Sequence, residues 1–568
     1  MFNAIKNPRY QKAFFGLFLI FVFFFAMAVW YSPVFFKGYP PSPISTEMTL
    51  AKNISQTGVY GFEDKLNIVL PLESIPAEAE ISSAGNKLGP YSFAAIFKFA
   101  GWPDWDNLIW ISLAVSALSL VFFTIAVYSL FGLEAAVIFP FVYILLPSNW
   151  QTAVEAAGKY EFAWLYFSLF VLFFFWGRRQ KFNWIYLAGS GLFLALSCLA
   201  KEAMFIPALI FMIWLFFSGK KKNFLAVLIP LAVTLSILWV PAMMGKSNNN
   251  YYWLFVTNNV QKNEIHTDFD FYGHIFPDSY TFHFNKESIL EKLKNIDNSQ
   301  VGLSERFSQI KTSKNMSLRE ISILERLEVG SSIIVRHAVK YMSIDYMGGP
   351  FIFLLMILGL WQLKKTEKKD YYLFVSWLAV TPFLLSYAIL VSRNHLMDLS
   401  WPIATAVTLG LVAIFPIMKS HFGRPKTAYV CLVLAVLYGL ILANHVFWGR
   451  IYDQVNTPEI RYLANQVEGI SSRDVIAIGQ SDLYPSINYI TSKSIVLFAP
   501  ETISGLIEKK ELSSVFETFR VKYIMGYSPE MTDLIIANSQ AKNIAVWPEK
   551  KMTESFDSNK SWILNLVR

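Results

Sequence analysis

Three successive apolar stretches decide the fold, and they lie together in residues 161–222: EFAWLYFSLFVLFFFWGRRQKFNWIYLAGSGLFLALSCLAKEAMFIPALIFMIWLFFSGKKK. Each stretch is close to the roughly 20 residues that an α-helix needs to cross the apolar core of a bilayer. Basic residues follow the first and third stretches, at Arg178 and Lys220, whereas Lys201 and Glu202 fill the turn after the second. The segment therefore predicts three helices that cross a membrane back and forth.

The same pattern recurs over the first 450 residues and predicts a polytopic α-helical membrane protein with about eleven transmembrane helices. The predicted spans are 13–31, 107–130, 133–148, 161–177, 183–200, 202–218, 223–243, 347–363, 371–391, 398–418 and 427–447. Of the 568 residues, 54% are hydrophobic and only 16% are charged, against about a quarter charged in soluble chains. This composition excludes a disordered chain, a collagen and a disulfide scaffold. The first apolar stretch is longer than that of a signal peptide, so we expect it to be retained.

Lysine and arginine residues gather on one side of the predicted spans. They are Lys6, Arg9, Lys12, Arg178, Arg179, Lys181, Lys220, Lys221, Lys222, Lys364, Lys365, Lys368, Lys369, Lys419, Arg424 and Lys426. Basic side chains near span ends resist translocation, so this side is predicted to be cytoplasmic. The opposite, extracytoplasmic side receives the long loops 32–106 and 244–346.

Two domains are predicted, a transmembrane core over 1–450 that includes both outer loops and an extracytoplasmic α/β domain over 451–568. In the second domain, short β-type runs alternate with helical stretches. The predicted strands are 475–478, 495–498, 523–525, 544–547 and 563–567, and the predicted helices include 459–467 and 501–507. Neither a phosphate-binding glycine loop nor a GxSxG motif occurs there, so we expect a docking or lid domain.

Ionisable side chains also gather at span ends on the extracytoplasmic side. A charge at the edge of the hydrocarbon region is costly unless it is paired or useful, which makes such residues functional candidates. The candidates are Glu47, Lys87, Glu161, Lys201, Glu202, Arg393 and His395. Carboxylates and cations that meet at one membrane surface suit a lipid-linked phosphate held beside a nucleophile.

Each candidate also has a structural interpretation. Lys201 and Glu202 could pair with each other at a helical turn, and Arg393 could extend to lipid headgroups. Glu47 could cap its own amphipathic helix, and His395 stands without partners at metal-ligand spacing.

No feature of the sequence indicates that the protein binds a cofactor or nucleic acid, and a divalent metal is possible but unsupported. The only two cysteines, Cys198 and Cys431, lie in apolar runs, so neither a zinc cluster nor a disulfide framework can be built. No group of histidines and carboxylates has the spacing of metal ligands. The formal net charge of +8 reflects membrane topology more than a nucleic-acid partner.

Five short motifs occur in a fixed order on the extracytoplasmic side. The first is Thr46-Glu47-Met48-Thr49-Leu50-Ala51-Lys52-Asn53-Ile54, which Thr57-Gly58-Val59-Tyr60 follows. The others are Lys87-Leu88-Gly89-Pro90-Tyr91, Tyr160-Glu161-Phe162, Leu199-Ala200-Lys201-Glu202 and Arg393-Asn394-His395 with Pro402. In this order and topology the chain resembles the GT-C type glycosyltransferases, which include protein O-mannosyltransferases and the bacterial aminoarabinose transferase. The chain departs from the family pattern at Glu47, where Asp is commoner, at Gly89 and at Asn394.

The resemblance implies transfer of a hexose or pentose from a polyprenyl-phosphate donor to a lipid, glycan or protein acceptor, with inversion, at a bacterial plasma membrane. Lys87, Lys201 and Arg393 would hold the donor phosphate. Glu47 would act as general base, and Glu161 would be a second base or would orient the acceptor. Glu202 and His395 would be accessory. The acceptor would belong to lipopolysaccharide or protein glycosylation.

Three other functions remain open from the sequence. A transporter or flippase of a lipid-linked glycan would also bind phosphate, although transporters place charges inside their spans. An O-antigen ligase or polymerase would use the late loop 244–346 but not the first loop. A binding or assembly protein would act through the domain 451–568.

Overall fold

The structure is a computed structural model, and it describes the parts of the chain that form regular elements. The described residues are 8–37, 48, 51–52, 54–55, 88–101, 105–154, 160–179, 183–201, 204–218, 221–244, 347–388, 399–422, 438, 466–467, 470, 474–479, 494–498, 500–518 and 520–545. They fall into two compact units. The first contains residues 1–30, 115–152 and 162–451, and the second contains 31–114, 153–161 and 452–568.

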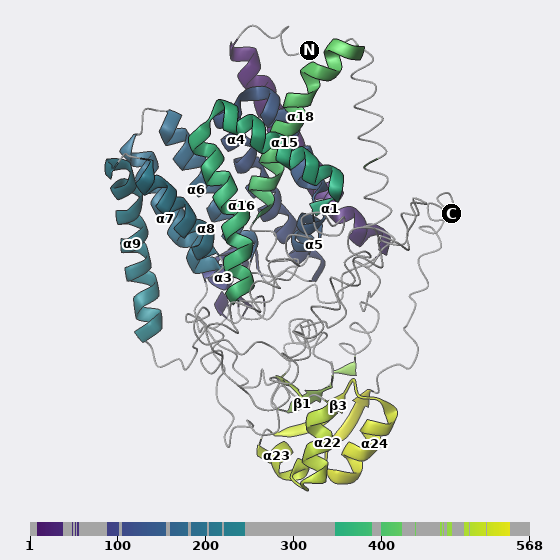
Figure 1. Cartoon of the computed structure of the whole chain (residues 1–568). Helices are drawn as coiled ribbons and strands as arrows, with labels where there is room; N and C mark the ends of the chain where they lie inside the picture. Colours follow the sequence, from purple (N-terminus) through teal and green to yellow (C-terminus); the bar gives the residue numbers. More distant parts are fainter. Residues whose placement is uncertain are drawn as a thin grey trace, which may run out of the picture. The chain divides into compact units, whose positions relative to one another are not determined.

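Helices occupy the first ten predicted spans (Figure 1). Their bounds are Pro8–Lys37 (α1), Trp105–Leu145 (α4), Glu161–Arg179 (α6), Trp184–Ala200 (α7), Phe205–Phe217 (α8), Lys221–Met244 (α9), Pro350–Thr366 (α15), Lys368–Ala388 (α16) and Ser400–Phe422 (α18). A helix at Leu88–Ala100 (α3) and a short helix at Pro147–Val154 (α5) accompany them. The predicted helical character is therefore confirmed for these spans, while the eleventh, 427–447, lies outside the described residues except for Tyr438.

Helix α4 covers two predicted spans, because a kink separates its two halves. Gly132 lies at the kink with a φ of 83°, a left-handed conformation that is favourable only for glycine. The predicted boundary between the spans 107–130 and 133–148 falls at this residue. Sequence position and backbone geometry thus agree that the chain turns back here.

Three of the described helices are both long and apolar enough to cross a bilayer, namely Tyr10–Ser32, Leu108–Leu145 and Glu161–Arg178. Shorter apolar helices occur at Trp184–Ala200, Phe205–Phe217 and Ser400–Pro416. Apolar helices of this number and length place the protein in a membrane.

Aromatic side chains form the centre of the first unit. The Phe123 ring lies 5.5 Å from the Trp164 ring and 5.9 Å from the Trp401 ring, measured between centroids. Trp377 lies 5.6 Å from Trp401 and 5.3 Å from Phe167. The rings meet edge to face, tilted or stacked, and edge-to-face and offset-stacked pairs at these distances are favoured arrangements of aromatic rings. They join α4, α6, α16 and α18 into one packed body.

A partly buried ion pair lies at the basic end of the first unit. Arg178, in the last turn of α6, places its guanidinium 2.7 Å from the carboxylate of Asp370 in the first turn of α16. Nearby, the Trp214 indole N–H donates to the Lys369 carbonyl at 2.9 Å. Two predicted basic connections, after α6 and before α16, therefore lie at the same end of the bundle.

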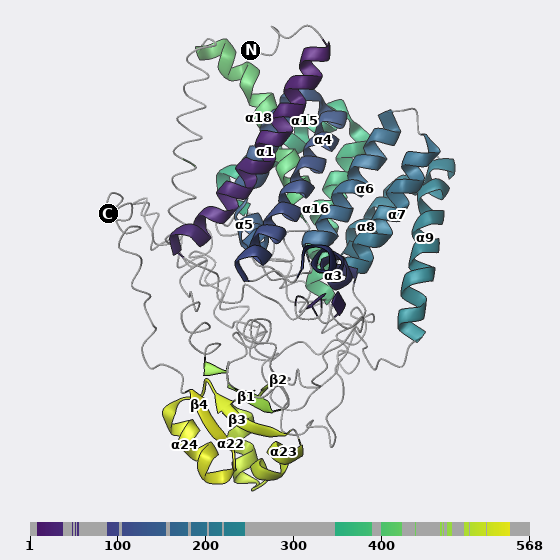
Figure 2. The same ribbon diagram turned by 180° about the vertical axis from the view of Figure 1, so that it is seen from behind.

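The described part of the C-terminal region is a small α/β unit. Its strands are Val475–Ile478 (β1), Ser494–Leu497 (β2), Val521–Met525 (β3) and Lys542–Ala545 (β4), all parallel in the order β2-β1-β3-β4. Helices Pro500–Glu508 (α22), Leu512–Thr518 (α23) and Pro529–Asn538 (α24) pack on one face (Figure 2). β4 begins two residues before the predicted strand 544–547, because its register is set by pairing with β3. The predicted strand 563–567 lies outside the described residues.

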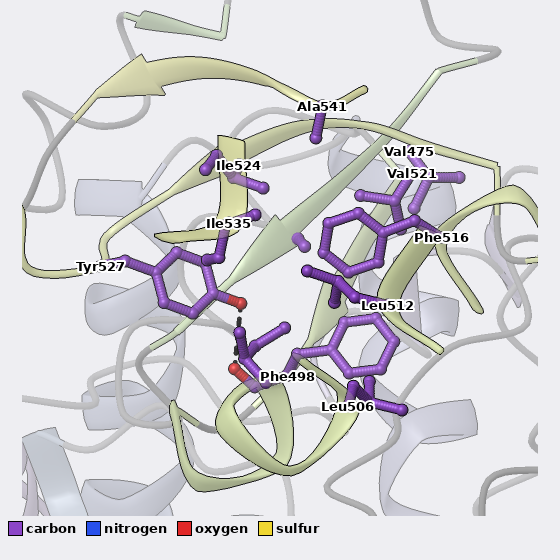
Figure 3. Packing of buried hydrophobic residues seen from close by; sticks show 12 residues of the cluster. Val475, Phe498, Leu506, Leu512, Phe516, Val521, Ile524, Tyr527, Ile535 and Ala541 are labelled. Carbon is purple, nitrogen blue, oxygen red and sulfur yellow. Dashed lines mark hydrogen bonds between the residues drawn. The ribbon is translucent and has the colours of Figure 1, made fainter. Parts of the chain in front are cut away.

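Tyr527 closes the core of this sheet, as Figure 3 shows. Its ring is buried, and its hydroxyl donates to the Phe498 carbonyl at 3.0 Å. Gly479, directly after β1, leaves room for the ring, because a Cβ there would lie 2.6 Å from a Tyr527 ring carbon. Burial raises the pKa of the Tyr527 phenol, so the hydroxyl remains a donor at all physiological pH.

Replacing Tyr527 with phenylalanine should lower the local unfolding free energy of the sheet by about 1 kcal/mol, the net value of a typical hydrogen bond. Hydrogen exchange of the β3 amides in the intact protein measures this change. Tyr523→Phe, at a half-buried position within β3, is the matched control. Equal exchange in both variants would contradict a stabilising role for the hydroxyl.

Candidate functional site

Glu161 is one of two predicted site residues that the structure describes. It is the first residue of α6 and only 1% exposed. The hydroxyl of Ser112, on α4, donates a hydrogen bond to its carboxylate. A carboxylate at a helix N-terminus is also stabilised by the helix dipole. The sequence thus places a buried, hydrogen-bonded acid where the fourth predicted span begins.

Lys201 is the second described candidate. It caps the C-terminus of α7, where its backbone N–H donates to the Ser197 carbonyl at 3.0 Å, and the residue is 9% exposed. The Ser197 hydroxyl donates to the Ala163 carbonyl at 2.8 Å, so the last turn of α7 lies beside the first turn of α6.

Lys52 is a buried cation that the sequence interpretation quoted but did not select. It lies on a helical segment with Met48 and Ala51, and all three are buried. Burial lowers the Lys52 pKa from its ordinary value of 10.5 to about 7. The signal was present in the sequence, because positions 48, 51 and 52 share one face of a helix. A lysine on an otherwise apolar helix face is a candidate site residue, as a lysine at a span end is.

A second missed feature is a polar network between α5 and α18. The Ser400 hydroxyl donates to the Asn149 side-chain carbonyl at 2.6 Å, and the Asn149 amide donates to the Tyr143 carbonyl at 2.8 Å. Ser148 lies 3.4 Å from the Ser400 hydroxyl, and all three side chains are buried. This network fixes the first turn of α18, which follows the segment with Arg393 and His395.

The other five predicted site residues, Glu47, Lys87, Glu202, Arg393 and His395, lie outside the described residues. Lys87 immediately precedes α3, and Glu202 immediately follows Lys201. Their roles stay predictions from the sequence. Among the residues that the structure describes, no group of three or more His, Cys, Asp or Glu side chains could hold a metal ion.

Comparisons with known proteins bear on the fold. No protein-family model matches the chain, and no curated protein matches it in sequence. An oligosaccharyltransferase from Archaeoglobus fulgidus, solved with zinc and sulfate, has a similar structure: the TM-score is 0.54 at 13% identity, over 89% of this chain and 67% of that one. The same archaeal enzyme, AglB, solved with an inhibitory peptide and a dolichol-phosphate, gives 0.53 at 12% identity, over 89% and 69%.

The aminoarabinose-transferase homologue ArnT from Cupriavidus metallidurans, bound to undecaprenyl phosphate, gives a TM-score of 0.49 at 9% identity, over 92% of this chain and 89% of that one. The likeness to the archaeal oligosaccharyltransferase shows that the chain has a GT-C-like fold. This is the class that the five sequence motifs predicted.

Proposed function

We propose that the protein is a membrane glycosyltransferase that moves a sugar from a polyprenyl-phosphate donor to an acceptor outside the cytoplasm. The observation that carries the proposal is that two residues of opposite charge, Glu161 and Lys201, are both buried in a protein with a GT-C-like fold. Buried charges at a membrane edge are retained where they handle a charged substrate.

The basic side chains of the site would bind the phosphate group of the donor. Cleavage of the anomeric C–O bond builds negative charge on the departing phosphate, and fixed lysines or arginines stabilise such charge. We assign this role to Lys201 together with Lys87 and Arg393, and we add Lys52. Support comes from the archaeal enzyme of similar fold, which was solved with a dolichol-phosphate.

The carboxylates of Glu47 and Glu161 would act on the acceptor. An acceptor hydroxyl must lose its proton as it attacks, and a carboxylate in hydrogen-bond reach is the simplest base. We assign that role to Glu47, and Glu161 orients the acceptor with help from Ser112. Attack opposite the leaving phosphate inverts the anomeric centre. An acceptor that is itself a phosphate would arrive ionised, and Glu47 would then orient sugar hydroxyls.

The proposed setting is a bacterial plasma membrane with the N-terminus in the cytoplasm. Arg178 and Lys369 lie at one end of the bundle, which the positive-inside rule assigns to the cytoplasm. Glu161 begins α6 at the other end. The domain over 451–568 would then be extracytoplasmic and would act as a lid or docking module.

The test is sugar transfer by the purified, full-length protein in liposomes. The liposomes receive radiolabelled polyprenyl-phosphate hexoses and a membrane extract of acceptors. A labelled product that forms only with the protein establishes a transferase, and its mass identifies the acceptor. Labelled lipid that crosses the bilayer without transfer would instead establish a flippase. The transporter is the less favoured function, since the archaeal enzyme of similar fold is a transferase.

A truncation after Arg450 separates the transferase from a binding or assembly protein. If the protein is a transferase, the truncated chain should still bind the donor, because the proposed phosphate ligands lie within 1–450. Loss of a protein partner with an intact, donor-binding core would favour the assembly function.

Donor affinity should depend on pH through Lys52. Above pH 7 the free protein holds this side chain mostly neutral, because its pKa is about 7. A bound phosphate favours the charged form, so the donor KM should rise above pH 7 by up to about tenfold per pH unit. The donor diester does not titrate in this range. Below pH 7, where Lys52 is already charged, the KM should be flat.

Measuring the donor KM from pH 6 to 9 checks this expectation. Lys52→Arg should remove the dependence, since arginine stays charged throughout. Lys98→Arg, an exposed position in the last turn of α3, is the control and should keep the parent profile. Parallel profiles in all three proteins would exclude Lys52 from the phosphate site.

A further inference from the structure

A groove of about 380 Å³ lies between α8 and α16 in the first unit. Its walls are apolar along most of their length, with Ile210, Ile213 and Phe217 on one side and Tyr372 and Val380 on the other. Ile213 is 49% exposed and Phe217 is 79% exposed. Side chains of this kind on a membrane helix face lipid, so the groove opens towards acyl chains.

One end of the groove is polar and positively charged. Lys369 and Ser218 line it there, and the Lys369 ammonium donates to the Ser218 carbonyl at 3.2 Å. An ammonium group has three donors, so this bond leaves capacity for an anionic ligand. The Trp214 indole N–H, which donates to the Lys369 carbonyl, fixes the backbone that carries the lysine. The ammonium group of Lys369 thus lies at one end of an otherwise apolar groove.

The charged end lies away from the candidate site. Asp370, the next residue after Lys369, pairs with Arg178 in the last turn of α6. Glu161 is the first residue of the same helix, 17 positions earlier. At 1.5 Å per residue these two turns are about 25 Å apart. A donor whose phosphate lies near Lys201 would not place that phosphate at Lys369.

We propose that this groove is a binding site for an anionic phospholipid of the leaflet at the Lys369 end. One acyl chain lies between α8 and α16, and the headgroup phosphate contacts Lys369. The combination of apolar walls with a cation at one end of the groove matches the apolar chain and the charged headgroup of an anionic phospholipid. Basic pockets between transmembrane helices bind anionic headgroups in the same way.

Native mass spectrometry of the purified full-length protein tests the proposal. The protein is equilibrated with equal amounts of phosphatidylglycerol and phosphatidylcholine that carry the same acyl chains. The parent should retain phosphatidylglycerol preferentially. Ile213→Trp, which fills the groove, should lower its retention about tenfold, equivalent to roughly 1.4 kcal/mol. Lys369→Gln should instead abolish the preference between the two lipids.

Two variants outside the groove act as controls. Leu209→Trp places the same side chain on α8 at a position that is 53% exposed, and Lys368→Gln removes a neighbouring charge. Both should retain phosphatidylglycerol like the parent. Equal retention in all five proteins would overturn the proposal. Displacement of phosphatidylglycerol from the parent by polyprenyl phosphate, but not from Ile213→Trp, would also overturn it, because the groove would then hold the donor tail.

Discussion

Replacing Glu47 with glutamine should lower the turnover of sugar transfer by about 10²- to 10⁴-fold, the contribution that a positioned general base makes. Glutamine has nearly the same shape but cannot accept the proton of the acceptor hydroxyl. Donor binding should be unchanged, because the proposed phosphate ligands are cations elsewhere in the chain. Single-turnover transfer, with a separate measurement of polyprenyl-phosphate binding, measures both quantities.

Glu161→Gln provides the contrast. If Glu161 orients the acceptor, its loss should raise the acceptor KM and lower turnover less than Glu47→Gln does. Ser112→Ala, which removes the hydroxyl that donates to Glu161, should shift the same constants in the same direction but by less. Glu47→Asp keeps a carboxylate and should retain measurable turnover. A fully active Glu47→Gln protein would remove Glu47 from the role of base.

Much of the membrane fold was predictable because the constraint is local. A span needs enough apolar residues in succession, and the charged turns around residues 178 and 201 mark where each helix ends. Gly132 likewise marks the turn within α4, since its φ of 83° demands glycine. The order of strands in the C-terminal sheet was not predictable. β1 pairs with both β2 and β3, and that choice depends on contacts between segments far apart in sequence.

The candidate site was predictable only in part, for the same reason. Glu161 and Lys201 stand at span ends, so sequence alone identified them. One hydrogen-bond partner of Glu161 is Ser112, 49 residues earlier, and no local pattern connects the two. The network of Asn149 with Ser400 joins residues 251 positions apart. Small polar side chains such as Ser112 and Ser400 cannot be recognised as part of a network from the sequence, because their partners are known only once the helices are packed.

Close helix packing in the first unit depends on glycines placed opposite carbonyl groups. A Cβ at Gly359 of α15 would overlap the carbonyl oxygen of Ala406 on α18, and a Cβ at Gly410 of α18 would overlap the carbonyl oxygen of Leu355 on α15. Leu355 lies one turn before Gly359 on α15, and Ala406 lies one turn before Gly410 on α18. Each helix therefore presents a carbonyl to the glycine of the other helix. Small residues of this kind let membrane helices approach closely and gain van der Waals contact.

Gly359→Leu should consequently destabilise the bundle by about 3 kcal/mol or more, because the side chain meets backbone that cannot move aside as a flexible side chain could. Loss of the monodisperse, folded protein in detergent, or a large fall in its Tm, is the expected result. Gly16→Leu is the matched control, since a Cβ at Gly16 of α1 meets nothing within 4 Å. If Gly359→Leu and Gly16→Leu had the same Tm, α15 and α18 would not pack through these glycines. The first turn of α18, which Ser400 ties to Asn149, would also shift with α15, so a partly folded Gly359→Leu protein should lose transfer activity before it loses its helices.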